Sequence, residues 1–250
     1  MKKINNLILL MILSIMIVGC KKDDFIKYGP DSDIVIVEVI SEQEIIKILQ
    51  DVAINSQNCK SYAYTQQTKG EFDLSDGTVD IGSDTYFAMD VTDENNIMIQ
   101  YKSDATNFDG KYKSESYYKV DCAFYSTKRP GEDTIKYKEK SPVGVVPLMI
   151  AQLANLRSVT LSFYINNISD FYFGKSNNGC IIIQSSEQLD NEYNNEFKIV
   201  IENGYIKYTY YEMSFHSQHR MKEQTVYYYD DIVVKFPKDL KKYDDYKNII

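Results

Sequence analysis

Hydrophobic and polar residues alternate along most of this chain, as they do in β-strands that bury one face. Alternating runs follow one another through residues 61–126, and Asp76-Gly77 separates two of them. Asp-Gly suits the tight turn of a β-hairpin, because both residues accept the positive φ angles that this turn requires. Residues 61–126 are therefore predicted to form an antiparallel meander. Its last long strand is predicted at 117–125, and Arg129-Pro130-Gly131 is predicted to end it.

The second half of the chain has the same alternation. Asn203-Gly204 predicts another hairpin, and Pro237 is predicted to end the last strand, because proline cannot donate to a sheet ladder. No sequence repeat or long linker interrupts these runs, so residues 41–250 are predicted to form a single domain. The strands predicted in this half are 161–165, 171–173, 180–183, 197–201, 205–215 and 226–236.

Two segments have a helical period instead. In the capping box that begins at Ser41, the serine hydroxyl accepts from the amide of Glu44, and the Glu44 carboxylate returns to the amide of Ser41. Apolar residues then recur at helical spacing, which predicts a helix from about Glu42 to Ile54. A second helix is predicted at 143–157, where apolar residues cover more of the circumference than a surface helix needs. These apolar residues are Val145, Val146, Leu148, Met149, Ile150, Leu153 and Leu156.

The N-terminus has the three regions of a secretory signal peptide. Lys2-Lys3 precede an apolar run at 7–18 that is short for a transmembrane helix, and Gly19 precedes Cys20. The tetrapeptide ending at Cys20 resembles the bacterial lipobox, in which the cysteine is acylated with diacylglycerol and becomes the new N-terminus. The resemblance implies a signal peptide at 1–19, a lipidated tether at 20–40 and an extracytoplasmic protein anchored to a bacterial membrane. Two acyl chains hold a protein stably on a membrane.

Composition narrows the choice of partners. The formal net charge of the 250 residues is −8, and an acidic chain lacks the basic stripe that nucleic-acid binding requires. We therefore expect no nucleic-acid partner. Besides Cys20, three cysteines remain: Cys59, Cys122 and Cys180. One disulfide with a spare thiol and three free thiols are both compatible with their spacing.

The order of these elements resembles that of the LolA/LppX-like lipoprotein-carrier superfamily. The shared order is a lipidated N-terminus, an amphipathic helix, a long meander, an apolar mid-chain helix and further hairpins, and the segment 227–237 looks most like the family's closing motif. The resemblance implies an α+β fold, a large curved antiparallel sheet forming an unclosed half-barrel. Helices would cover its concave face over an apolar cavity for acyl chains. The apolar residues of 143–157 are the candidates for lining that cavity.

No motif in the chain indicates catalysis. It has no nucleophile elbow, phosphate loop, H-E-x-x-H or paired cysteine motif, so we expect no catalytic residue, no cofactor and no enzyme activity. His216, His219 and nearby Glu212 give too few ligands for a zinc site. Asn107-Phe108-Asp109-Gly110 imitates part of a calcium loop but lacks its terminal acid, and a turn is predicted there.

The sequence thus predicts a membrane-anchored, non-enzymatic lipoprotein. Its expected ligand is a lipid, a lipid-linked molecule or an envelope protein, bound in an apolar groove. The alternative is a surface-exposed interaction or adhesion lipoprotein with a filled β core and no ligand cavity. Its 22 tyrosines favour that alternative, since tyrosine combines a large apolar area with a polar tip.

Overall fold

A computed structural model of the chain describes residues 22–74, 77–93, 95–140, 165–185, 193–215, 219–229 and 232–246. Several predictions concern residues outside these ranges. They are the signal peptide at 1–19, lipidation at Cys20, the turn residue Asp76 and the histidine His216. The apolar helix at 143–157 also lies outside them, with its cavity candidates Val145, Val146, Leu148, Met149, Ile150, Leu153 and Leu156. Of the strand predicted at 161–165 only Ile165 is described, and it is helical.

The described residues form one large sheet of 13 strands. They are mainly β, with two α-helices, α2 (Lys22–Tyr28) and α3 (Glu42–Asn58), so the helical part of the predicted α+β fold is small here. Two short 3₁₀ helices, η1 (Ile168–Asp170) and η2 (Leu240–Lys242), complete the helical elements. The strands are β1 (Glu38–Val39), β2 (Ser61–Leu74), β3 (Gly77–Asp90), β4 (Met98–Asn107), β5 (Gly110–Tyr118), β6 (Cys122–Lys128), β7 (Ile135–Lys140), β8 (Phe171–Lys175), β9 (Ile181–Ser185), β10 (Tyr193–Glu202), β11 (Tyr205–Phe215), β12 (His219–Tyr229) and β13 (Asp244–Asp245).

The strand order makes the sheet open. It runs β1-β8-β9-β10-β11-β12-β2-β3-β4-β5-β6-β7-β13, so β1 and β13 lie at opposite edges. Every described pair is antiparallel except β7 with β13. The two halves of the chain meet where β12 pairs with β2, in register from His219 opposite Phe72 to Tyr229 opposite Tyr62. The predicted large, unclosed and antiparallel sheet is confirmed to this extent.

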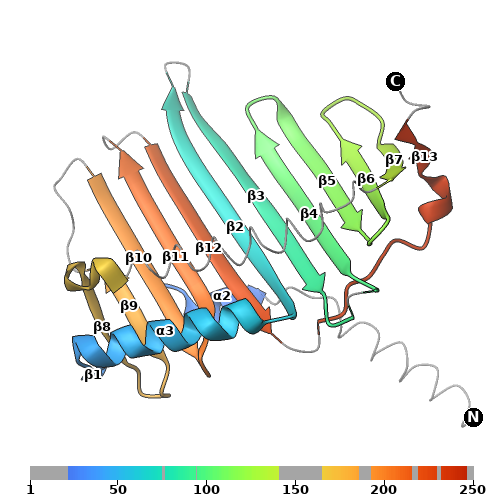
Figure 1. The fold of residues 1–250 in the computed structure, drawn as a ribbon. Coiled ribbons are helices and arrows are strands. Elements are labelled where there is room, and N and C mark those ends of the chain that lie inside the picture. The colour runs from blue at the N-terminus through green and yellow to red at the C-terminus, as the bar shows by residue number, and fades with distance from the viewer. Residues whose placement is uncertain are drawn as a thin grey trace, which may run out of the picture.

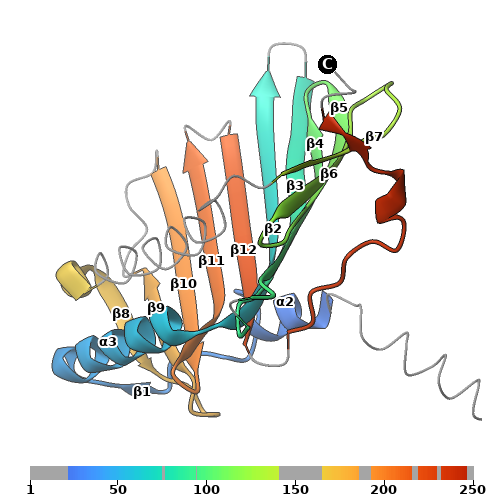
Figure 2. The same cartoon turned by 45° about the vertical axis from the view of Figure 1, so that its right-hand side comes forward.

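The sheet is bent, and the helices lie on different faces of it. Figures 1 and 2 together show β8–β12 and the meander β2–β7 meeting at an angle, with α3 on the concave side. Helix α2 and the segment that follows β12 lie on the convex side. Since side chains alternate along a strand, neighbouring residues of one strand serve different faces.

On the concave side, α3 packs over the strands of the second half. The hydroxyl of Ser41 accepts from the amide of Glu44 at 3.2 Å, as predicted. The carboxylate of Glu44 lies 2.9 Å from Nζ of Lys175 on β8, where the capping box predicts a bond to Ser41. The helix runs four residues past the predicted end at Ile54. It buries one apolar stripe in a cluster that consists of Ile40, Ile45, Leu49, Val52, Ile168, Ile183, Ile199 and Ile201.

The convex side has its own core. Phe25 and Tyr28 of α2 pack with the alternate residues of β9–β12, in the cluster Phe25, Tyr28, Ile34, Cys180, Ile182, Val200, Tyr208, Tyr210 and Val226. Farther along, Val234 packs on Ala63 and Ala88, and Tyr243 packs with Tyr117 and Phe124. Residues within the segment predicted as a tether, 20–40, therefore belong to the core.

Several strand boundaries differ from the prediction. Arg129-Pro130-Gly131 does not end the meander: it forms a turn into β7, in which the Glu132 amide bonds to the Arg129 carbonyl at 3.2 Å. Residues 117–125 are not one strand, because a tight turn at 119–121 separates β5 from β6. Apolar Val120 stands between the polar residues Lys119 and Asp121, and this local alternation hid the second turn.

The last long strand also lies earlier in the chain than predicted, at His219–Tyr229 in place of 226–236. Strand β12 ends at Tyr229, and residues 232–236 leave the sheet and pack on its convex face through Val234. The alternation of buried and exposed residues there reflects packing on the sheet and not pairing within it. The three described cysteines, Cys59, Cys122 and Cys180, are free thiols. No helix among the described residues has the length and hydrophobicity needed to span a membrane.

Candidate functional site

The concave face of the meander presents a row of tyrosines. Tyr101 on β4 lies opposite Ser116 on β5, Ser116 lies opposite Tyr125 on β6, and Tyr125 lies opposite Tyr137 on β7. Residues paired across a sheet share a face, so this register brings side chains from four strands into one line. We call Tyr64, Tyr101, Tyr118, Tyr125, Tyr137 and Tyr227 the tyrosine surface.

Ring contacts link these tyrosines from strand to strand. The rings of Tyr125 and Tyr137 stack with centroids 4.9 Å apart, and Tyr118 meets Tyr125 edge to face at 5.9 Å. At the other end, Tyr64 lies 6.1 Å from Tyr227 and stacks on Phe87 at 5.2 Å. Such ring pairs add about 0.5–1.5 kcal/mol each to the stability gained by area burial. The rings of the tyrosine surface therefore pack against neighbouring aromatic rings.

The tyrosine surface continues into a buried apolar cluster on the same face. That cluster contains Tyr62, Phe87, Met89 and Ile99, with Tyr64, Tyr101 and Tyr118 packed against it. Burial raises the pKa of the Tyr125 hydroxyl, and the neighbouring Tyr118 and Glu139 raise it further. The hydroxyl therefore stays neutral at ordinary pH. Chemically, the concave face offers aromatic carbon area with neutral hydrogen-bonding tips.

The convex face of the same strands is mixed in character. At one end of β4 and β5 it carries charged side chains, and Lys113 lies 3.4 Å from Asp104 and 4.0 Å from Glu115. Exposed charges of this kind remain solvated and contribute little to stability. At the other end, Ala88 packs with Val234, and Tyr117 and Phe124 pack with Tyr243. The row of tyrosines is thus a feature of the concave face.

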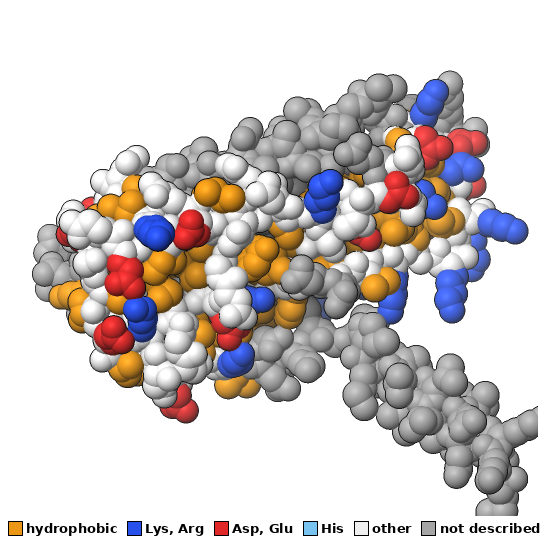
Figure 3. Space-filling view, turned by 60° about the horizontal axis from the view of Figure 1, so that its bottom comes forward, with side chains coloured by type: hydrophobic (Ala, Val, Ile, Leu, Met, Phe, Trp, Pro, Cys, Tyr) orange, Lys and Arg blue, Asp and Glu red, His pale blue; other side chains and the backbone are white. Residues whose placement is uncertain are grey.

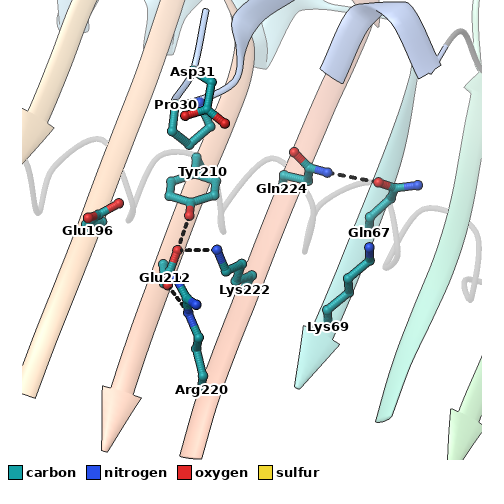
Figure 4. Close-up of a pocket in the computed structure, with 10 residues that line it drawn as sticks. All are labelled: Pro30, Asp31, Gln67, Lys69, Glu196, Tyr210, Glu212, Arg220, Lys222 and Gln224. Carbon is teal, nitrogen blue, oxygen red and sulfur yellow. Dashed lines mark hydrogen bonds and ion pairs between the residues drawn. The ribbon is translucent and has the colours of Figure 1, made fainter. Parts of the chain in front are cut away.

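A polar pocket of about 360 Å³ lies on the convex face of β10, β11, β12 and β2 (Figure 4). Pro30 and Asp31, in the loop that follows α2, form one side of it. Its lining residues are Pro30, Asp31, Gln67, Lys69, Glu196, Tyr210, Glu212, Arg220, Lys222 and Gln224. The charged members are three cations and three carboxylates, so the lining has no net charge.

Glu212 is the central residue of this pocket. Its side chain is 7% exposed, and it receives hydrogen bonds from the Tyr210 hydroxyl and from Nε of Arg220. Nζ of Lys222 lies 2.9 Å from its second oxygen. Strand register explains the grouping, because Lys222 lies directly opposite Glu212 on the neighbouring strand. Figure 4 shows all three partners turned toward the carboxylate.

The protonation of Glu212 follows from these contacts. Burial raises the pKa of its carboxyl, but hydrogen bonds from Tyr210, Lys222 and Arg220 outweigh burial and hold the pKa below its usual range. A carboxylate that stays ionised and already has three donors is a poor general acid or base. Beside it, Gln224 donates to Gln67 at 2.8 Å and accepts from the Tyr208 hydroxyl at 3.3 Å. The pocket's described polar groups largely bond to one another.

Two candidates considered from the sequence are now placed. Glu212 faces the convex side of the sheet, whereas His219 lies on a position of β12 that faces the concave side, with its ring 5.4 Å from that of Phe72. They cannot bind one ion together. Among the described residues, no group of three or more His, Cys, Asp or Glu side chains could hold a metal ion. The turn predicted near Asp109 is confirmed, because Gly110 has a φ of 123° between β4 and β5.

Sequence reasoning missed both surfaces as units. The alternation of tyrosines was visible, but which tyrosines share a line depends on strand register. Likewise, Arg220 and Lys222 follow Glu212 by eight and ten residues, and only the β11–β12 pairing brings them together. If the register of the β11–β12 hairpin had been assigned from the end of β11, it would have placed Glu212 beside Arg220 and Lys222.

No protein-family model and no curated protein matches this sequence. Among solved structures, LprF from Mycobacterium bovis aligns with a TM-score of 0.36 at 9% identity, over 78% of this chain and 97% of that one. A DUF1329 family protein from Desulfovibrio piger aligns with a TM-score of 0.28 at 9% identity, over 76% of this chain and 95% of that one. The ywiB protein from Bacillus subtilis aligns with a TM-score of 0.17 at 11% identity, over 68% of this chain and 93% of that one. Scores this low are not evidence of a shared fold or function.

Proposed function

We propose that this protein is a membrane-anchored lipoprotein that binds a lipid or lipid-linked molecule against the concave face of its sheet. The tyrosine surface on the concave face of the meander carries this proposal. An apolar sheet face needs an apolar cover. Helix α3 provides that cover over β8–β11. An acyl chain would cover part of the tyrosine surface.

The N-terminal sequence supports the anchoring part of the proposal. Acylation of Cys20 would hold the protein at a membrane, where lipid is abundant in the bilayer. The ligand class follows from the surface chemistry. Aromatic rings would contact the chain of an amphiphile, and the neutral tyrosine hydroxyls would donate to its ester or headgroup oxygens.

Uptake of a fluorescent fatty acid tests the proposal directly. The polypeptide from Lys21 onward contains every described element and lacks the proposed acylation site Cys20. We expect it to bind the probe with saturation and to release it to unlabelled fatty acid. Absence of saturable binding, together with absence of any co-purified amphiphile in native mass spectrometry, would contradict the proposal.

A pair of matched substitutions locates the binding face. Ser116 lies between Tyr101 and Tyr125 on the concave side, whereas Thr106 lies on the convex side of β4. Both are half-buried hydroxyl residues. Ser116→Glu places a carboxylate among the tyrosines and is expected to weaken binding by about tenfold or more, because an acyl chain cannot solvate it. Thr106→Glu should leave binding unchanged. Equal effects of the two substitutions would place the ligand elsewhere.

The alternative function is a protein-interaction module. Its support is the continuation of the tyrosine row to the sheet edge, where Tyr246 lies 5.2 Å from Tyr137. Tyrosine is enriched at protein interfaces. The fatty-acid experiment separates the two functions, because a protein-binding surface would show no saturable uptake of a single-chain amphiphile.

A further inference from the structure

Helix α2 is firmly attached to the convex face. Phe25 and Tyr28 are 8% and 5% exposed, and the ring of Tyr28 stacks on Tyr208 with centroids 6.2 Å apart. The Tyr28 hydroxyl bonds to Glu202 at 3.2 Å. Just after the helix, Nζ of the buried Lys198 donates to the Gly29 carbonyl at 3.0 Å. The start of the folded domain is therefore fixed in place.

This attachment leaves very little chain between the domain and a lipid anchor. Lys22 begins α2, and Cys20 precedes it by two residues. Two residues span at most about 7 Å when fully extended. If Cys20 carries acyl chains, they leave the protein beside the first turn of α2. The convex face must then lie close to the bilayer.

The surface around that point has the composition expected of a membrane contact. Ile26 of α2 is 73% exposed and Val233 is 63% exposed. Figures 1 and 2 both show the start of α2 beside residues 232–236, and Tyr228 packs against the cores beneath both segments. Lys27 and Lys235 are exposed next to the two apolar residues. Figure 3, which brings the bottom of the molecule forward, shows hydrophobic side chains lying between charged ones on the face in view.

We infer that Ile26 and Val233 insert into the bilayer interface, and that this contact sets the orientation of the anchored protein. The inference rests on the proposed acylation of Cys20. Lys27 and Lys235 would lie at the level of the lipid headgroups, since lysine keeps its charge in water while its stem contacts apolar surface. We call Ile26, Lys27, Val233 and Lys235 the membrane-contact surface. The tyrosine surface, on the other side of the sheet, then faces away from the anchoring membrane.

Two apolar side chains orient the protein and do not anchor it. Burying one such side chain contributes about 1.5–3 kcal/mol, which is far less than two acyl chains contribute. Loss of the membrane-contact surface should therefore change the tilt of the protein and leave its attachment intact. This difference separates the inference from simple lipid anchoring.

Tryptophan fluorescence provides a test without background, because the chain contains no tryptophan. Ile26→Trp and Val233→Trp each place one probe on the membrane-contact surface. Val39→Trp is the matched control, since Val39 is an aliphatic residue that is 81% exposed on the edge strand β1. Each lipidated full chain is reconstituted into vesicles of phosphatidylcholine and phosphatidylglycerol with brominated acyl chains, which quench tryptophan within the bilayer.

We expect quenching of about twofold or more for Ile26→Trp and Val233→Trp, and none for Val39→Trp. If all three proteins float with the vesicles and the first two remain unquenched, the anchor exists and the inferred orientation is wrong. If none floats, the anchoring part of the proposed function fails, and the orientation fails with it. Failure of fatty-acid uptake alone would leave these results unchanged. The measurement is repeated with a second envelope protein added to the vesicles. If quenching requires that protein and is lost when a protease removes it, a protein partner occupies this surface and direct lipid contact is contradicted.

Discussion

At the residue scale, the polar pocket shows how a buried charge is accommodated. Glu212 is nearly inaccessible, yet Tyr210, Arg220 and Lys222 all donate to its carboxylate. Because the donors come from β11 and β12, the cluster also fixes the register of that hairpin. A carboxylate held in this way is a structural element of the convex face and not a reactive group.

Replacing this carboxylate should destabilise the protein in a pH-dependent way. Glu212→Gln is expected to lower the free energy of unfolding at pH 7 by about 1.5–3 kcal/mol, since hydrogen bonds to a charged group are lost. The folded-state pKa of Glu212 lies below its ordinary value of 4.5. Its contribution is therefore complete above that value and is lost as the pH falls through the folded-state pKa. Urea unfolding at several pH values measures it.

Glu196→Gln is the control for this measurement. Glu196 lines the same pocket but is exposed, so its replacement should change stability by less than about 0.5 kcal/mol at every pH. If Glu212→Gln shows the same small effect, or a penalty that grows as the pH falls, the hydrogen-bonded cluster does not stabilise the fold.

The turn at Asn203-Gly204 provides a second test at this scale. Gly204 has a φ of 75°, and a Cβ placed there would lie 2.7 Å from Nδ2 of Asn55, which donates to the Gly204 carbonyl. Gly179 has a φ of 81° with open space around it. Both Gly→Ala substitutions incur the backbone cost of about 1–2 kcal/mol. Gly204→Ala should lower the melting temperature further than Gly179→Ala does, and equal shifts would mean that the Asn55 contact is unimportant.

At the element scale, helix α3 and the Asn203-Gly204 turn were predictable because their signals are local, whereas helix α2 lies in the segment predicted as a tether. Ser41 begins α3 and an apolar stripe continues it. The positive φ angles of Asn203 and Gly204 confirm the hairpin predicted from that dipeptide. The turn between β5 and β6 was missed, because Lys119, Val120 and Asp121 carry no glycine or proline. The residues after Tyr229 were misread as strand, because Val234 alternates with exposed neighbours as a strand residue would.

Helix α3 should contribute strongly to stability through its buried stripe. Leu49 is fully buried in the cluster beneath the helix, whereas Ile54 is 55% exposed on the same helix. Leu49→Ala is expected to cost about 2–5 kcal/mol in the free energy of unfolding, because it removes apolar contacts and leaves a cavity. Ile54→Ala should cost less than about 1 kcal/mol. Chemical denaturation of both variants checks this, and similar costs would show that α3 does not pack as described.

At the scale of the whole molecule, the sequence could not reveal how the two halves join. The pairing of β12 with β2 links residues 147 to 167 positions apart, from His219 with Phe72 to Tyr229 with Tyr62, and no local pattern specifies a pairing at that separation. The bend of the sheet, which gives the tyrosine surface its place on the concave side, is equally non-local. The candidate site was predicted only as a groove lined by 143–157. The tyrosine surface, which the proposed function uses, depends on this long-range order.

The measurement that tests the central claim most directly is photo-crosslinking with a fatty acid that carries a photoreactive group in its chain. The polypeptide from Lys21 onward is irradiated with the probe, digested and mapped by mass spectrometry. The account predicts adducts on the concave side of β4–β6, at or beside Tyr101, Tyr118 and Tyr125, which excess unlabelled fatty acid abolishes. Adducts confined to the charged convex side of those strands, or labelling that unlabelled fatty acid does not reduce, would contradict it.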